Sequence, residues 1–203
     1  MSACSRICRQ ISAILLTIMC VFSLSSCAGD KNGKKHLLEV MFEDYVAEVD
    51  FLLDVEGVSV SGTARITKND NVRIELLSPD PYTGISVQGD AGDKASVLSI
   101  EYSGIRADIP KNAVHKLSIM LSMFSDAAVT NIGKQSGNDF KLSAGEYVLA
   151  GFDKINPYEV SFVKGETEYI YIYDSISGIP LNIYAKSGAT ALQVKIKKFK
   201  AIE

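Results

Sequence analysis

The chain has 203 residues, a formal net charge of -3, no tryptophan and two histidines. The mild acidity argues against nucleic acid as a partner, and the length fits one domain of ordinary size behind an N-terminal leader. Nine tyrosines and eight phenylalanines, with many valines and isoleucines, indicate a β-rich fold.

The first segment of the chain has the pattern of an export leader. Arg6 and Arg9 precede an apolar run from Ile11 to Leu24, which suits a signal peptide and is too short to cross a bilayer as a helix. The stretch Leu24-Ser25-Ser26-Cys27 then places a cysteine after small residues and resembles the lipobox of bacterial lipoproteins. This resemblance implies that residues 1–26 are removed as a signal peptide and that Cys27 is the site of lipid attachment. The alternatives are an uncleaved N-terminal anchor and a plain secretory signal.

The cysteines agree with this interpretation. Cys4, Cys8 and Cys20 lie in the leader, so Cys27 alone would remain after cleavage, with no disulfide or thiolate metal site in a monomer. The mature chain would carry a net charge of -5, because the leader holds two arginines and no acidic residue. Acyl chains on Cys27 would anchor the protein outside the cytoplasm, on the outer face of the cell membrane, or on the outer membrane if the organism has one.

Residues 27–35 are expected to be the lipidated cysteine and a flexible tether, because Ala28 to Lys35 are small, polar and glycine-containing. A single domain is expected over residues 36–203, opening with a short helix from His36 to Glu43.

The first half of this domain alternates apolar and polar residues with a period of two, which is typical of strands. The turn Glu56-Gly57 joins the first two segments as an antiparallel hairpin. The strands expected here are Tyr45–Val55, Val58–Thr67, Val72–Ser78, Gly84–Gln88, Ala95–Tyr102 and Ile105–Ile109.

One helix is expected from Ala113 to Ser125, since apolar residues recur there at helical spacing. Strands return afterwards. They are expected near Phe140–Leu142, Glu146–Phe152, Tyr158–Val163, Glu168–Asp174, Leu181–Ala185 and Ala191–Phe199.

So many consecutive strands with one or two helices predict a mainly β, α+β fold: one large curved antiparallel sheet of about ten or eleven strands, with the helix over its concave face. In this order of elements the chain resembles the LolA/LolB superfamily of lipoprotein-handling proteins. The local carriers of the resemblance are Gly62, Arg73-Ile74-Glu75, Ser78-Pro79, Gly84, Asp174 and Gly178-Ile179-Pro180-Leu181. The tryptophan common in that family beside the third-strand arginine is absent here.

The resemblance implies a half-barrel whose helical lid encloses an apolar cavity for acyl chains, and the lipobox favours the anchored, LolB-type member. The alternative is that the same side chains form a filled core. The residues expected to line the cavity are Val49, Phe51, Leu53, Val60, Ile66, Ile74 and Leu76 of the sheet and Leu117, Met120, Leu121 and Phe124 of the lid.

Two further residues are singled out by their positions. Arg73 is either an arginine on the sheet surface or a latch that donates hydrogen bonds across the mouth of the cavity. Tyr82 lies in Pro79-Asp80-Pro81-Tyr82-Thr83, which corresponds in order to a membrane-contacting loop of the LolB-type receptor. The alternative is an ordinary loop aromatic between turn-forming prolines.

Nothing in the sequence favours an enzyme. His36 and His115 match no catalytic motif, and no phosphate-binding, nucleophile-elbow or metalloprotease signature is present. The sequence therefore predicts no cofactor and no metal, and a monomer that binds an acylated or other apolar ligand at the cell envelope without chemistry. The alternative is a sensor or interaction lipoprotein that uses the same fold to contact another envelope protein.

Overall fold

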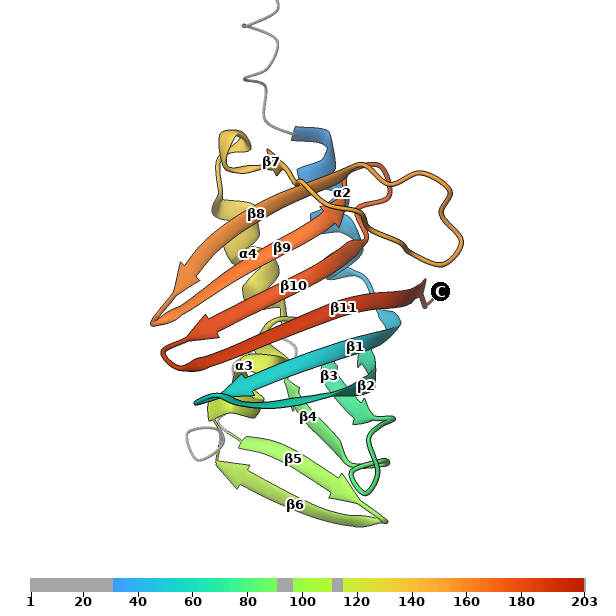
Figure 1. Cartoon of the computed structure of the whole chain (residues 1–203), viewed down its shortest axis with the longest axis vertical. Helices are drawn as coiled ribbons and strands as arrows, with labels where there is room; N and C mark the ends of the chain where they lie inside the picture. The colour runs from blue at the N-terminus through green and yellow to red at the C-terminus, as the bar shows by residue number, and fades with distance from the viewer. Residues whose placement is uncertain (1–30, 91–96, 111–114, 203) are drawn as a thin grey trace, which may run out of the picture.

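The computed structural model describes residues 31–90, 97–110 and 115–202. Eleven antiparallel strands form one sheet, and the helices lie behind it in the view of Figure 1. The strands are β1 (Tyr45–Val55), β2 (Val58–Lys68), β3 (Asn71–Leu76), β4 (Ser86–Asp90), β5 (Val97–Tyr102), β6 (Ile105–Pro110), β7 (Lys141–Leu142), β8 (Pro157–Lys164), β9 (Thr167–Asp174), β10 (Pro180–Ser187) and β11 (Thr190–Ala201).

The order of strands across the sheet is β6-β5-β4-β3-β2-β1-β11-β10-β9-β8-β7. The first and last strands of the domain pair with each other along their whole length, from Tyr45 opposite Ala201 to Val55 opposite Thr190. The edges β6 and β7 are not paired with each other, so the sheet stays open. The predicted mainly β half-barrel is confirmed.

The helices are α2 (Lys31–Phe42), α3 (His115–Ser122) and α4 (Asp126–Lys134), and a short 3₁₀ helix η3 covers Gly137–Asp139. The single helix expected from Ala113 to Ser125 is wrong in its C-terminal boundary; residues 113 and 114 lie outside the described residues. The side-chain oxygen of Ser125 accepts a hydrogen bond from Ala128 N at 3.4 Å and caps a second helix. Ser125 therefore marks the start of α4, which the sequence analysis missed.

The start of the domain also differs from the expectation. Residues 31–35, expected as part of the tether, form the first turns of α2. They are held there because Gly33 is buried and Lys34 Nζ donates a hydrogen bond to Gly133 O at the end of α4, at 2.9 Å.

The strand expected over Glu146–Phe152 is wrong. This stretch is a loop that crosses the outer face of the sheet (Figure 1). Ala150 N donates a hydrogen bond to Lys197 O of β11, and Phe152 N donates one to Leu149 O within the loop. These backbone hydrogen bonds thus form a turn and a single contact with a distant strand, instead of a strand ladder. Leu149 is buried beneath this loop.

Candidate functional site at the concave face

Where the helices cover the sheet, apolar side chains form one continuous core. The packing is close at Gly89 of β4, where an added Cβ would lie 3.1 Å from Leu121 Cδ1 of α3 and from Leu98 of β5. The predicted cavity residues that are buried in this core are Val49, Phe51, Ile66, Ile74, Met120, Leu121 and Phe124. The alternative of a filled core therefore describes the helix-covered part of the concave face.

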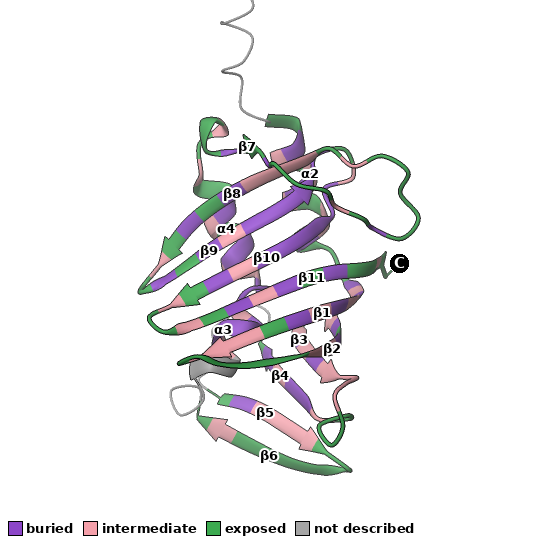
Figure 2. Cartoon of the chain, in the orientation of Figure 1, coloured by how far each residue is buried: buried purple, intermediate pink, exposed green. Residues whose placement is uncertain are grey.

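Beyond the helices the same face becomes accessible. Ile66, Ile74, Val87, Ile100 and Ala107 stand opposite one another in successive strands from β2 to β6. The first three are buried, Ile100 is half-buried and Ala107 is exposed. Figure 2 shows the same change in burial from strand to strand: β4 is mostly purple, β5 is mostly pink and β6 is mostly green.

A second gradient runs along the hairpin of β1 and β2. Phe51 is buried, and Leu53, the next residue on the same face, is half-buried. Leu53 stands opposite Val60, which is 41% exposed. Leu76 of β3 is half-buried as well. We call the accessible apolar part of the concave face the open end. Its exposed members are Val58, Val60, Tyr102 and Ile105.

Two further predicted site residues fall wholly or partly outside the described residues. Cys27 lies outside the described residues. Leu117 belongs to α3, but its side chain is also outside the described set.

A groove of about 290 Å³ lies on the opposite, convex face of the sheet. Its walls include Leu52 of β1, Ile170 of β9, Tyr184 of β10 and Ala191 of β11, and none of the predicted cavity residues lines it. The signal for this site was the run Tyr169-Ile170-Tyr171-Ile172-Tyr173, which is apolar on both faces of one strand. The three tyrosines are buried on the concave side, and Ile170 is left to line the groove.

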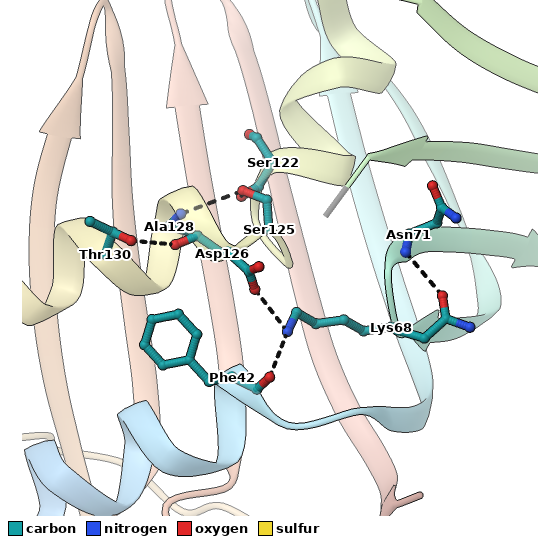
Figure 3. Close-up of polar contacts among 9 residues, drawn as sticks. Phe42, Lys68, Asn71, Ser122, Ser125, Asp126, Ala128 and Thr130 are labelled. Carbon is teal, nitrogen blue, oxygen red and sulfur yellow. Dashed lines mark hydrogen bonds and ion pairs between the residues drawn. The ribbon is translucent and has the colours of Figure 1, made fainter. Parts of the chain in front are cut away.

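A buried cation joins the sheet to the helices (Figure 3). Lys68, at the end of β2, is only 2% exposed, and its Nζ lies 2.9 Å from Asp126 Oδ1 of α4. The same Nζ donates to Phe42 O at the end of α2, at 3.2 Å. The sequence signal was available, because Lys68 follows Ala64 and Ile66 on the inward-facing phase of the strand.

Arg73 is not a latch to the helices. Its Nη1 lies 3.5 Å from Glu101 Oε2 of β5, and the neighbouring Ile74 occupies the concave face, so Arg73 belongs to the convex surface. The interpretation of Arg73 as a surface arginine holds, and the contact between β2 and α4 is made by Lys68 instead.

Tyr82 is 51% exposed in the loop between β3 and β4. The start of this loop is fixed, since Thr63 N donates to Ser78 Oγ at 2.8 Å and Ser78 N donates to Thr63 O. In Figure 1 the loop lies near β5, at the end of the molecule opposite the start of α2.

Three buried titratable residues have perturbed pKa values. Burial raises the pKa of Tyr45 and of Tyr171, and Tyr171 donates a hydrogen bond to Met123 O at 2.6 Å. Burial alone would raise the pKa of Asp174, but hydrogen bonds from Asn156 N and from Ser177 outweigh it and lower the pKa. These groups are tied into packing and turns. His36 Nδ1 lies 3.2 Å from Ser175 O, beside the same turn.

Within residues 31–90, 97–110 and 115–202 no three His, Cys, Asp or Glu side chains gather as a set of metal ligands. In the same ranges, no helix combines the length and the apolarity needed to cross a bilayer.

The fold defines the class: an open, eleven-stranded half-barrel with helices over one face. No family model and no curated protein matches the sequence. Solved structures do resemble the fold. A LolA superfamily protein from Nitrosomonas europaea is 7% identical, with 86% of this chain and 94% of that chain covered and a TM-score of 0.44.

Two other structures are similar. A putative outer membrane lipoprotein-sorting protein domain from Vibrio parahaemolyticus is 8% identical, with 85% of this chain and 92% of that chain covered and a TM-score of 0.40. The lipoprotein LppX from Mycobacterium tuberculosis is 10% identical, with 81% and 91% covered and a TM-score of 0.40. At identities this low the likeness is one of fold alone, and it says nothing about the ligand of this chain.

Proposed function

We propose that this chain is a lipid-anchored, extracytoplasmic binding protein that takes an acylated or other apolar ligand at the open end of its concave face, without chemistry. Attachment would be through Cys27. The ligand would contact the accessible apolar residues of β1, β2, β5 and β6, next to the filled core.

The observation that supports this proposal is the graded exposure of one apolar face. A soluble surface rarely keeps a contiguous apolar patch unless something covers it in use. Here the exposed side chains lie on the concave side of a curved sheet, where Val60 is 41% and Ile105 75% exposed. Concave apolar surfaces are the usual sites for small apolar ligands.

The side chains at the border between the core and the open end are of a kind that can repack around a ligand. Helix α3 lies against β3 and β4, and Met120 of this helix and Met123 just after it are buried in the core. Methionine side chains are flexible and fill irregular space, so a shift of α3 could admit a ligand deeper under the helix.

The convex groove favours the second candidate function, an interaction lipoprotein. Its walls are apolar, and Glu168 and Lys186 stand opposite each other in the register of β9 and β10 beside them. A groove of about 290 Å³ suits a side chain or short segment of another protein better than a whole lipid. In this case the open end would be empty in cells.

Native mass spectrometry with organic extraction, on the full chain recovered from bacterial membranes in mild detergent, tests the first proposal. We expect a stoichiometric lipid or other apolar molecule that is lost from Val60→Glu and from Ile105→Glu, because a carboxylate in the open end would have to be desolvated by the ligand. Both positions are exposed, so the fold should persist.

The matched control is Val163→Glu, which places the same charge at an exposed apolar position of β8 on the other face of the sheet. It should retain the ligand. An empty protein, or a ligand lost equally from all three variants, would contradict binding at the open end and leave the interaction protein as the better account. Intact-mass measurement of Cys27→Ala against the unchanged chain tests lipid attachment separately.

A further inference from the structure

We propose that one end of the molecule, formed by the first turn of α2, the last turn of α4, η3 and β7, lies against anionic lipid headgroups. This inference rests on the proposed lipid attachment at Cys27 and adds an orientation to it. We call this surface the basic end and define it by Lys31, Lys134, Lys141 and Leu142.

The connection between Cys27 and the domain is short. Helix α2 begins at Lys31, four positions after Cys27. Four residues span at most about 14 Å even when fully extended. A lipid on Cys27 would therefore keep the first turn of α2 near the headgroups, whereas the expected tether, with its end at Lys35, would have allowed any orientation.

Helix α2 is packed firmly against the rest of the domain. Leu37 and Met41 are fully buried in the core, and Lys34 Nζ donates to Gly133 O. The backbone of Gly137 in η3 is so close that an added Cβ would lie 3.3 Å from Lys31 Cγ. The position of the anchor therefore fixes which end of the domain is nearest the membrane.

The basic end carries exposed positive charge. Lys31, Lys134 and Lys141 are all exposed; Lys31 lies beside Gly137 of η3, and the other two lysines flank this helix in sequence. The mature chain would be acidic overall, with a net charge of -5. An anionic surface would attract the basic end and repel the rest of the domain.

Two acidic residues, Asp139 and Glu159, also lie at this end. Asp139 accepts a hydrogen bond from Ser136 N at 2.7 Å, and Glu159 stands opposite Lys141 in the ladder between β7 and β8. Beside them Leu142, at the edge of the sheet, is 68% exposed. Lysines around an exposed leucine are the combination expected of a surface that touches headgroups and reaches just below them.

The orientation has a consequence for the open end. In Figure 1 the start of α2 and β7 lie at the top, and β5, β6 and the loop between β3 and β4, which holds Tyr82, lie at the bottom. The open end and Tyr82 would then face away from the membrane that holds the anchor. The loop of Tyr82 would not be the membrane contact.

Fluorescence quenching from a single labelled cysteine tests this orientation. Full chains with Leu142→Cys or Tyr82→Cys, both exposed positions, would be labelled after recovery and placed in vesicles of phosphatidylcholine, with and without phosphatidylglycerol, that carry a nitroxide on the headgroup. The unchanged chain corrects for label on native cysteines. We expect strong quenching at position 142 in anionic vesicles and little at position 82.

The charge contribution is tested by a triple variant, Lys31→Gln, Lys134→Gln and Lys141→Gln, which should lower quenching at position 142 toward that in phosphatidylcholine alone. Salt at about 1 M, where the screening length is about 3 Å, should also lower the quenching at position 142 in the chain that keeps all three lysines. The control removes three exposed lysines of β10 and β11 by Lys186→Gln, Lys195→Gln and Lys200→Gln and should leave the quenching unchanged.

Flotation of the vesicles separates the two ways of failing. A chain that does not float with vesicles is not anchored, which would overturn both the proposed function and the orientation. A chain that floats but is quenched equally at both positions, or more at position 82, keeps its anchor and overturns the orientation alone.

Discussion

Asp174 shows how one buried residue organises a turn. Its Oδ1 accepts a hydrogen bond from Asn156 N at 2.8 Å, and its Oδ2 accepts from Ser177 N and from Ser177 Oγ, at 3.0 and 2.7 Å. One carboxylate thus joins the turn after β9 to the loop before β8. The same turn touches α2, because Ser175 O lies 3.2 Å from His36 Nδ1.

We expect Asp174→Asn to lower the free energy of unfolding by about 2 kcal/mol near neutral pH, because an amide replaces one acceptor oxygen with a donor. The pKa of Asp174 is lowered in the folded state, so its stabilising contribution is present above its ordinary value of 3.8 and is lost as the pH falls through the folded pKa. Urea titrations at a series of pH values should therefore show that the unchanged chain and Asp174→Asn differ less in free energy of unfolding below pH 3.8. In Asp54→Asn, at an exposed turn, a change of at most about 0.5 kcal/mol is expected.

Lys68 is the second residue whose loss has a definite cost. In Lys68→Met the apolar stem is kept, while Asp126 Oδ1 and Phe42 O lose the ammonium group that joins them. The side chain of Asp126 is 42% exposed as a whole, although its Oδ1 is buried, so we expect a loss of about 2 kcal/mol instead of the larger cost of a fully buried pair. Denaturant unfolding measures it. A variant as stable as the unchanged chain would mean that the pair contributes nothing to holding α4.

At the scale of elements, the docking of α2 depends on one glycine. Gly178 has φ +75°, and an added Cβ would lie 2.3 Å from His36 O in α2. We expect Gly178→Ala to destabilise the protein by about 3 kcal/mol, from the left-handed backbone together with the forced displacement of the helix. The matched control is Gly188→Ala, where φ is +57° but nothing lies within 4 Å, and a loss of about 1 kcal/mol is expected. Thermal unfolding of both variants separates the clash from the backbone cost.

The elements differed in how well the sequence predicted them. Strands β1 and β2 alternate over the part of their length where one face is buried and the other meets water, and their hairpin was found at Glu56-Gly57. Helix α4 was missed because Ser125 ends one helical stretch and caps the next, so that the apolar spacing looks continuous up to the cap. The stretch Glu146–Phe152 is as apolar as a strand, yet its hydrogen-bond partners lie in a turn and in β11, which only the tertiary structure determines.

The candidate site was harder to predict than the fold. Burial of Val49, Ile66 and Phe124 follows from periodicity, but periodicity does not distinguish a filled core from a cavity. Val60 continues the same alternation as Ile66 and is nevertheless 41% exposed, near the turn of the β1–β2 hairpin. The reach of a helix across a sheet is set by connections between distant segments, and no local pattern records it.

In the molecule as a whole, the central strands of the sheet are better paired and more buried than its edge strand β6. The central strands β1, β11 and β10 are paired on both sides and covered by helices, whereas β6 is an edge strand with five of its six residues exposed. Local opening costs least where few apolar contacts are lost. We therefore expect native-state hydrogen exchange to be slowest in β1, β10 and β11 and fastest, among the strands of the first half, in β6.

Binding at the open end would change this order. A ligand held against Ile100 and Ile105 stabilises only the closed state of β5 and β6, so their amides should slow when it is bound, while those of β10 keep their rate. Exchange measured on the ligand-loaded and the extracted protein makes the comparison, with Val60→Glu as the unbound reference. Slowing confined to the strands of the convex groove, β9 to β11, would instead assign the apolar ligand to that face and leave the gradient along the concave face without a function.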